Sequence, residues 1–313
     1  MSVPTVSVLI PCYNAERFIG ETLESVFRQT WPGIEVIVVD DDSRDESVTE
    51  VRRFPGVRLI RQDHAGAAAA RNRAYAESSG AFIQILDADD LIAPDKIERQ
   101  VERLQDHPRC VASAEWGRFY RASAETRFEP ESVWRDLDPI DWLVLSRAEG
   151  LGMLFPALWL IPRVIADAVG PWDETLSVGD DGEYFTRILL AAERVLFCDG
   201  ARCYYRSGLA GSLSGGKSAQ ALASQFRVLE LCESYLRTRE DSERVRSGFA
   251  LSWQHFAHAS YPYDADLAEG ALARARELHP ATIRPGGGPA FHAVSRLVGW
   301  RFARRLQVAS GRP

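Results

Sequence analysis

The chain has 313 residues, of which 46% are hydrophobic, 26% charged and 10% aromatic, and its formal net charge is −7. This composition is typical of a globular protein, and the acidic balance argues against a general nucleic-acid binder, which needs a basic face to displace counterions from phosphates. The five cysteines are an odd number without a C-x-x-C pair, so we expect them to be reduced and the protein to be cytoplasmic. We expect neither a secretion signal nor a membrane span, because no apolar run is long enough.

The first hundred residues alternate between short β-branched runs and amphipathic stretches. The pattern predicts strands at residues 6–10, 36–39, 57–60 and 81–86, with helices at 17–29 and 66–79 and a further helix from about residue 94. Strand-helix-strand repeats of this kind build a parallel sheet. The predicted fold class is therefore α/β, with a Rossmann-like, mostly parallel sheet flanked by helices.

The rest of the chain divides into two further parts. Residues 111–214 are rich in tryptophan and show no clean repeat, so we expect irregular strands and loops there. Residues 215–313 have apolar stripes at helical spacing within 222–236, 245–256 and 267–278, and a glycine-rich break at 285–289 precedes a final basic helix. These patterns predict a domain at 1–214, with halves 1–110 and 111–214, and a helical C-terminal region at 215–313.

Two acidic clusters directly follow two of the predicted strands. One is Asp40-Asp41-Asp42, and the other begins at Asp87 and includes Asp89. The carboxyl ends of parallel strands are where ligands bind in open α/β sheets, so both clusters should lie at one edge. Asp87 and Asp89 are spaced to share Mg²⁺ or Mn²⁺, cations that take one or two protein carboxylates together with water and substrate phosphates. Taken alone, the first cluster is equally well explained as a solvated turn that caps a helix near residue 45.

Charged residues in two predicted helices complete the candidate site. Arg71 is expected to donate to phosphate oxygens, whereas Arg73 points to another side of its helix and is expected at the surface. Asp181 is predicted to project from a helix start and to take a proton from an attacking hydroxyl. The alternative is a structural role in which Asp180 caps that helix and Glu183 completes a capping box, and the two interpretations are compatible.

Five segments in this order resemble the family-two inverting nucleotide-sugar glycosyltransferases of the GT-A fold. They are SVLIPCYN (7–14), VVDDDS (38–43), AARN (69–72), LDADD (86–90) and GDD (179–181). The resemblance covers residues 6–214. It implies a GT-A catalytic domain in which residues 1–110 bind the nucleotide sugar and residues 111–214 bind the acceptor.

The resemblance also implies roles for single residues. Pro11, Tyr13 and Asn14 would line the nucleoside pocket, with Tyr13 near the base, and Asp41 would accept a hydrogen bond from that base. Arg71 would contact the diphosphate.

The acidic positions match the family's remaining motifs. Asp87 and Asp89 match its D-x-D element, with Asp89 the more direct metal ligand and Asp87 also near the nucleotide. Asp181 matches the catalytic base, with Asp180 beside it. This sequence departs from the family pattern at Asp42, where Gly or Asn is usual, and at Asp180, where Glu is common. No histidine follows residues 204–206, where some relatives place one, so no third protein ligand is assigned.

The reaction implied is transfer of a sugar, with inversion at C1, from a nucleotide diphosphate sugar to an acceptor hydroxyl, with a divalent metal, Mn²⁺ or Mg²⁺, at the leaving diphosphate. A UDP-sugar donor is expected, and the acceptor would be a glycan, a lipid-linked molecule or a small molecule. The alternatives are a nucleotidyltransferase of similar fold and a non-catalytic nucleotide- or sugar-binding module. A nucleotidyltransferase would usually carry a glycine-rich basic loop after its first strand, which this chain lacks.

The C-terminal residues are basic. No acidic residue follows Glu277, whereas arginine occurs at Arg284, Arg296, Arg301, Arg304, Arg305 and Arg312. One interpretation is a helix docked on the catalytic domain with a solvated arginine face. The other is a helix lying on an anionic membrane, which would place the enzyme at the inner face of the membrane.

Overall fold

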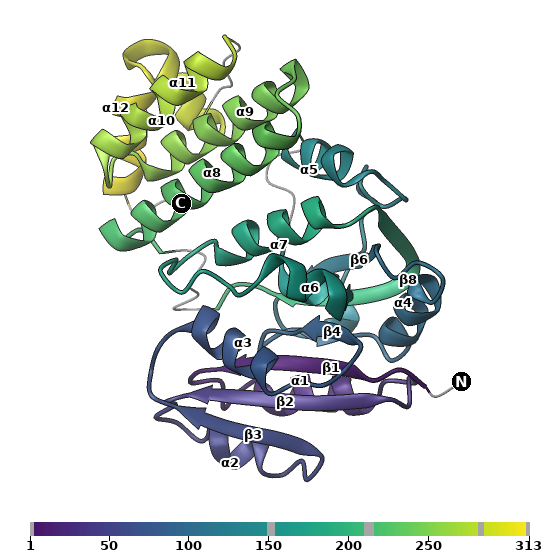
Figure 1. Cartoon of the computed structure of the whole chain (residues 1–313). Coiled ribbons are helices and arrows are strands. Elements are labelled where there is room, and N and C mark those ends of the chain that lie inside the picture. Colours follow the sequence, from purple (N-terminus) through teal and green to yellow (C-terminus); the bar gives the residue numbers. More distant parts are fainter. Residues whose placement is uncertain (1–2, 149–153, 210–215, 281–284, 311–313) are drawn as a thin grey trace.

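A five-stranded sheet forms the centre of the fold in the computed structural model, which describes residues 3–148, 154–209, 216–280 and 285–310. Its strand order is β3-β2-β1-β4-β7. The strands are β1 (Val6–Cys12), β2 (Ile34–Asp41), β3 (Val57–Gln62), β4 (Phe82–Ile85) and β7 (Ile161–Pro162). The first four are parallel and β7 is antiparallel to β4. The predicted mostly parallel α/β sheet is confirmed, and Figure 1 shows it in the lower half of the molecule.

Helices cover this sheet because its strands are apolar on both faces. Val36 is 4% exposed and the next three residues of β2 are 0% exposed. The nearby helices are α1 (Ile19–Phe27), α2 (Ser47–Val51), α3 (Ala67–Ala76) and α4 (Lys96–Leu104). α3 packs on β1 and β2. It approaches closely because Ala70 and Ala74, which face the sheet, are small and fully buried.

The second part of the chain is more regular than its sequence pattern predicts. A three-stranded sheet of order β5-β8-β6 is formed by β5 (Leu91–Ile92), β6 (Val111–Phe119) and β8 (Val195–Arg206). The expected irregular strands are present in that the pairing of β6 with β8 shifts register between Ala114 and Glu115, but β8 is also a long strand of 12 residues. The other elements are η1 (Ser123–Glu125), α5 (Pro139–Ala148), η2 (Pro156–Leu158), α6 (Arg163–Val169) and α7 (Asp180–Ala191).

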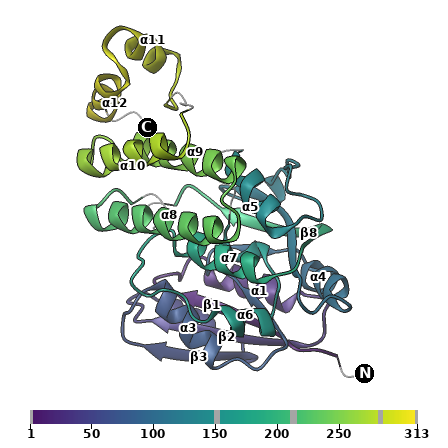
Figure 2. The ribbon, with the colours of Figure 1, turned by 45° about the horizontal axis from the view of Figure 1, so that its top comes forward.

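The C-terminal region is helical, as predicted. Its helices are α8 (Ala219–Arg239), α9 (Glu243–Ser260), α10 (Ala265–Leu278), α11 (Pro289–Val298) and α12 (Trp300–Ala309). The single final helix that we expected is two helices, because Gly299 adopts a φ of 83° and breaks the chain between them. Figures 1 and 2 show this region at the end of the molecule opposite β3, with α11 and α12 farthest from the sheet.

The C-terminal region is packed on the preceding part of the fold rather than linked loosely to it. α8 contacts α7, and α9 contacts α5. The predicted boundary at residue 214 lies outside the described residues, as do Arg284 and Arg312. The division into two domains therefore stays a prediction.

Two other expectations concern the whole chain. All five cysteines, Cys198 and Cys203 among them, are buried and free, which agrees with the expectation that they are reduced. None of the helices in the described ranges is long and apolar enough to cross a bilayer.

Candidate active site

The carboxylate of Asp41, at the end of β2, organises the loop that leads into α3. Its Oδ1 accepts from the backbone N–H of Ala65 and from Gln62 Nε2, both at 2.8 Å. Its Oδ2 accepts from the backbone N–H of Gly66 at 2.8 Å and lies 3.0 Å from His64 Nδ1. A carboxylate offers about four acceptor positions, and three donors of the protein fill three of them. His64 Nδ1 lies beside the fourth position and is also 3.1 Å from the Asp41 backbone oxygen, so a nucleobase that binds Asp41 would take the place next to His64.

Two aromatic rings lie beside this carboxylate. The Tyr13 ring, 47% exposed, is 4.5 Å from the His64 ring between centroids, at an interplanar angle of 34°. Tyr13 follows β1, the strand between β2 and β4, so it occupies the middle of the same sheet edge. The rings provide an accessible apolar surface next to a polar acceptor, which suits a flat heterocycle.

The turn below Tyr13 is fixed by contacts between two loops. Asn14 N–H donates to Ser43 Oγ at 2.9 Å, and Asn14 Oδ1 accepts from Arg44 N–H at 2.8 Å. Asp42 has a φ of 64°, in the left-handed region that favours Gly and Asn. This backbone conformation explains why Gly or Asn is usual at this position, since both adopt it more readily than other residues. The alternative in which Asp42 or Ser43 caps a helix near residue 45 was wrong, since α2 begins at Ser47 without a side-chain cap.

Arg71 joins two acidic groups that are far apart in the sequence. Its Nη2 donates to Asp87 Oδ1 at 2.8 Å, and its Nη1 donates to Asp180 Oδ2 at 2.7 Å. The side chain is 7% exposed, and its Nε, also buried, has no hydrogen-bond partner among the described residues. Burial lowers the pKa of Arg71, but the Asp87 and Asp180 carboxylates more than offset this effect, so the pKa is raised overall. Arg73 is 54% exposed and pairs with Glu77, so the predicted difference between the two arginines is confirmed.

The segment after α6 holds Arg71 in place. The Arg71 guanidinium lies 4.5 Å from the Trp172 ring centroid. The Asn72 side chain accepts from Trp172 N–H at 2.8 Å and donates to Trp172 O at 3.0 Å. These paired bonds fasten the segment to α3, and sequence reasoning gave no role to either Asn72 or Trp172.

Asp87 and Asp89 lie beyond β4, as predicted, and both are partly buried. The Asp87 side chain is 29% exposed. Burial, and then the neighbouring Asp87 carboxylate, raise the pKa of Asp89 to about 6. The Arg206 side chain donates to the backbone oxygen of Asp89 at 2.8 Å, and the Arg206 N–H donates to Asp90 Oδ1 at the same distance. Asp90 and Arg206 thus attach the acidic turn to β8, a contact that sequence reasoning missed.

Asp180 and Asp181 are the first two residues of α7. The predicted helix start is confirmed, but the capping alternative was wrong. Gly179 is the N-cap, with φ 81°, and the Glu183 side chain pairs with Arg187 at 2.7 Å. Burial, and then Asp180, raise the pKa of Asp181 to about 7, while Arg71 lowers it. Burial also raises the pKa of Asp180, against the effect of Arg71.

α8 supports the residues that lead into α7. Ser224 Oγ accepts from Ser177 N–H at 3.0 Å and from Val178 N–H at 3.1 Å, and it donates to Val178 O at 2.9 Å. The Val228 side chain packs against Gly179: a Cβ atom added to that glycine would lie 3.6 Å from it. The C-terminal region therefore fixes the position of the Asp180-Asp181 pair.

The Asp87–Asp89 pair fits a divalent cation. Their mutual repulsion contributes to the raised pKa of Asp89, and a cation between them would relieve it. Within the described residues no group of three or more His, Cys, Asp or Glu side chains is arranged to hold a metal ion. Two carboxylates are nevertheless enough for Mg²⁺ or Mn²⁺ when a diphosphate and water supply the other oxygens.

The structure brings most of the predicted site residues together. Arg71 contacts Asp87 and Asp180 directly, and Asp181 is close enough for all three charges to affect its pKa. Asp41 and Tyr13 lie farther along the same sheet edge, and the loop bound by Asp41 leads into the helix that carries Arg71. The sequence predicts Asp41 as a ligand of the base, whereas the contacts show it also as the anchor of the loop containing His64.

The family model described as Glycosyl transferase family 2 matches residues 7–169. The chain is 35% identical over 131 residues to the uncharacterized glycosyltransferase YibD of Escherichia coli K12, covering 40% of this chain and 38% of that protein. It is 32% identical over 220 residues to the uncharacterized glycosyltransferase EpsJ of Bacillus subtilis 168, covering 65% of this chain and 61% of that protein.

A third relative is named for a specific activity. The chain is 40% identical over 102 residues, 32% of this chain and 40% of the relative, to WfgD of Escherichia coli, named a UDP-Glc:alpha-D-GlcNAc-diphosphoundecaprenol beta-1,3-glucosyltransferase. These matches span less than two thirds of each relative's length. Among solved structures, residues 1–349 of TarS from S. aureus in complex with UDP superpose with a TM-score of 0.65 at 18% identity, covering 98% of this chain and 92% of that one.

The structural similarity confirms the GT-A-like fold, and the family match covers more than half of the chain. The matched region includes Tyr13, Asp41, Arg71 and the Asp87–Asp89 pair, and it ends before Asp181. The chain belongs to glycosyl transferase family 2.

Proposed function

We propose that this chain is an inverting glycosyltransferase that moves a sugar from a UDP-sugar to an acceptor hydroxyl. The observation on which the proposal rests is the convergence of Asp87, Asp180 and Asp181 around the buried Arg71, at the sheet edge where parallel strands end. Family membership supports sugar transfer over the other reactions considered. Complexes of the similarly folded TarS with UDP and with UDP-GlcNAc support a uridine donor.

Asp181 is the general base in this proposal. A carboxylate with a pKa of about 7 is half ionised at neutral pH and is a stronger base than an ordinary aspartate. Removal of the acceptor proton makes the hydroxyl oxygen a better nucleophile for C1 of the sugar. Attack on the face opposite the leaving diphosphate inverts that carbon.

Arg71 and the Asp87–Asp89 pair act at the diphosphate. The guanidinium of Arg71 donates to phosphate oxygens, and its contacts with Asp87, Asp180 and Trp172 hold it in place before the donor binds. A divalent cation held by Asp89 and Asp87 would neutralise charge on the departing diphosphate. A preorganised positive charge of this kind lowers the barrier because it need not reorient during the reaction.

Tyr13, His64 and Asp41 form the proposed nucleobase site, with Pro11 and Asn14 shaping the turn beneath it. The base would lie on the Tyr13 ring and take one acceptor position of Asp41. Because three of those positions already accept from the protein, the base would take the fourth, where the His64 ring now lies.

The acceptor is proposed from the relative that is named for a specific activity. WfgD is named for transfer to a diphosphoundecaprenol-linked sugar, and we propose a lipid-linked acceptor for this chain as well. Such an acceptor resides at a membrane surface, so we place the enzyme at the cytoplasmic face of a membrane, in peripheral contact with it.

Substitution of Asp181 by asparagine tests the base. Loss of a general base should lower kcat by about 10²–10⁴-fold. UDP affinity, measured by calorimetry with Mn²⁺, should stay unchanged because Asp181 contacts the acceptor rather than the nucleotide. Asp199→Asn is the control, since Asp199 is an exposed residue on β8 outside the site. Wild-type turnover of a UDP-sugar by Asp181→Asn would exclude Asp181 as the base.

A further inference from the structure

The hairpin of α11 and α12 exposes a cluster of large apolar side chains. Leu297 is 85% exposed, Val298 53%, Phe302 50% and Leu306 49%. The four lie within ten residues of sequence on two adjacent helices. Single exposed hydrophobic residues are normal on protein surfaces, whereas a cluster marks an interaction surface.

The same hairpin is attached to the protein through other residues. The Trp300 ring packs 4.8 Å from the His258 ring and 5.3 Å from the Tyr261 ring, measured between centroids. Ala303 and Phe291 are buried. The four exposed side chains thus remain outside the hairpin's own packing, and Figure 2 shows α11 and α12 standing beyond α9 and α10, away from the catalytic part.

The charge of the hairpin is positive, in contrast to the net charge of −7 of the whole chain. Arg296 is exposed and forms no ion pair with any residue in the described ranges. The Arg305 guanidinium lies 5.4 Å from the Tyr261 ring centroid, and Arg301 pairs with Glu269 of α10. An anionic bilayer surface binds helices that expose apolar side chains and carry a net positive charge, since the apolar groups enter the acyl boundary and the arginines meet the headgroups.

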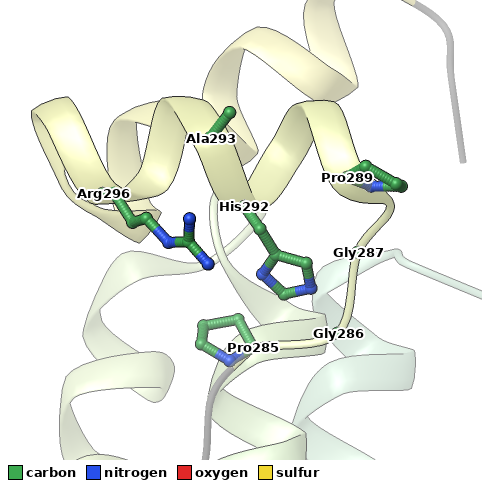
Figure 3. Close-up of a pocket in the computed structure, with 7 residues that line it drawn as sticks. All are labelled: Pro285, Gly286, Gly287, Pro289, His292, Ala293 and Arg296. Atoms are coloured by element: carbon green, nitrogen blue, oxygen red, sulfur yellow. The ribbon is translucent and has the colours of Figure 1, made fainter.

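A pocket of about 590 Å³ lies at the start of α11. It is lined by Pro285, Gly286, Gly287, Pro289, His292, Ala293 and Arg296, and none of these residues is acidic. Figure 3 shows the His292 and Arg296 side chains, one helical turn apart, pointing into the same space. A phosphate group there would meet the guanidinium of Arg296 and the imidazole of His292.

We propose that α11 and α12 form a binding site for anionic phospholipid. Leu297, Val298, Phe302 and Leu306 enter the membrane interface, and a headgroup phosphate occupies the pocket beside Arg296. The inference rests on the proposed function in that it names the surface and the lipid chemistry of the membrane contact. It does not depend on which sugar is transferred or on transfer itself.

Vesicle co-sedimentation of the full chain tests this site. The protein should pellet with vesicles of phosphatidylcholine and phosphatidylglycerol, and not with phosphatidylcholine alone. The double variant Phe302→Ser/Leu306→Ser should bind at least about tenfold more weakly, because both apolar groups lose their burial in the interface. Arg296→Gln should weaken binding about fivefold, which corresponds to one arginine near an anionic surface.

Matched controls separate this effect from a general loss of charge or apolar surface. Val164→Ser removes a side chain that is 58% exposed on α6, and Arg52→Gln removes an exposed arginine after α2; neither should change binding. UDP affinity reports folding of every variant and should stay at the wild-type value. Equal pelleting with both vesicle types, or unchanged binding of the double variant, would overturn the proposal.

Light scattering distinguishes a protein partner from a lipid surface. If the wild-type chain is a dimer in solution and Phe302→Ser/Leu306→Ser is a monomer, the apolar cluster is a contact between copies of the chain and the lipid proposal is wrong. Vesicle binding without sugar transfer would leave this inference standing while the proposed function fails, and transfer without vesicle binding would do the reverse.

Discussion

Replacement of Arg71 by methionine should destabilise the fold as well as prevent catalysis. Methionine keeps an unbranched side chain against Trp172 but removes the charge, which leaves Asp87 and Asp180 facing each other without a cation. Removal of one partner of a buried ion pair costs about 3–5 kcal/mol. Because the Asp87 side chain is 29% exposed and that of Asp180 15%, water screens part of the loss. We therefore expect the lower limit, about 3 kcal/mol.

The assay is thermal unfolding at neutral pH in the absence of nucleotide. At about 2 °C per kcal/mol for a chain of this size, the melting temperature should fall by about 6 °C. Arg73→Met is the matched control on the same helix, since its exposed pair with Glu77 contributes about 0.5 kcal/mol or less. Adding Asp180→Asn to Arg71→Met should recover part of the loss by removing one of the two unpaired charges.

If Arg71→Met has the same melting temperature as Arg73→Met, this reasoning is refuted, because the Arg71 guanidinium then does not stabilise the two carboxylates. The acidic groups would then be kept apart or hydrated in solution, and the convergence on which the proposed function depends would be in doubt.

Three further predictions concern the base, the helix start and the cation. The kcat for transfer should fall as the pH drops below about 7, because Asp181 acts as a base only when it is deprotonated. In Arg71→Met the inflection of the remaining kcat should move to higher pH, because Arg71 lowers the pKa of Asp181. A flat profile of kcat against pH would contradict this assignment. Gly179→Ala should lower the free energy of unfolding in urea by about 1–2 kcal/mol, because the φ of 81° at Gly179 is left-handed. Gly182→Ala, inside α7, should not destabilise the protein, and equal effects of the two substitutions would argue against backbone strain at Gly179. EDTA should stop sugar transfer by the wild-type protein, and added Mn²⁺ should restore it. In Asp89→Asn, Mn²⁺ should not restore transfer. Wild-type activity that persists in EDTA would argue against a role for a cation.

The sequence predicts the first half of the fold well because local and global signals agree there. Each of β1 to β4 is a short apolar run between helical patterns, and two of these runs end in aspartates. Parallel pairing then places Asp41 and Asp87 at one edge without further information. The long strand β8 escapes prediction because Asp199 and Gly200, the latter with a φ of 76°, interrupt its apolar residues, a pattern that also suits a turn between two shorter segments.

The candidate site is predictable where a motif identifies it and unpredictable where a contact is made across the fold. Asp181 is found from its helix start and the family pattern. His64 is missed because nothing in a Gln-Asp-His loop shows that Asp41 will hold it against Tyr13. Arg206 is missed for the same reason, since its bonds to Asp89 and Asp90 span more than 100 residues of sequence.

The support that α8 gives to the start of α7 bears on how the protein can be shortened. Ser224 supplies partners to three backbone groups of residues 177 and 178, and Val228 lies beside Gly179. A fragment that ends before α8 would keep every residue matched by the family model, residues 7–169, yet leave those backbone groups to water. If Asp181 is the proposed base, such a fragment should retain the strand ends that carry Asp41 and Asp87 but lose sugar transfer, because α8 would no longer hold the start of α7.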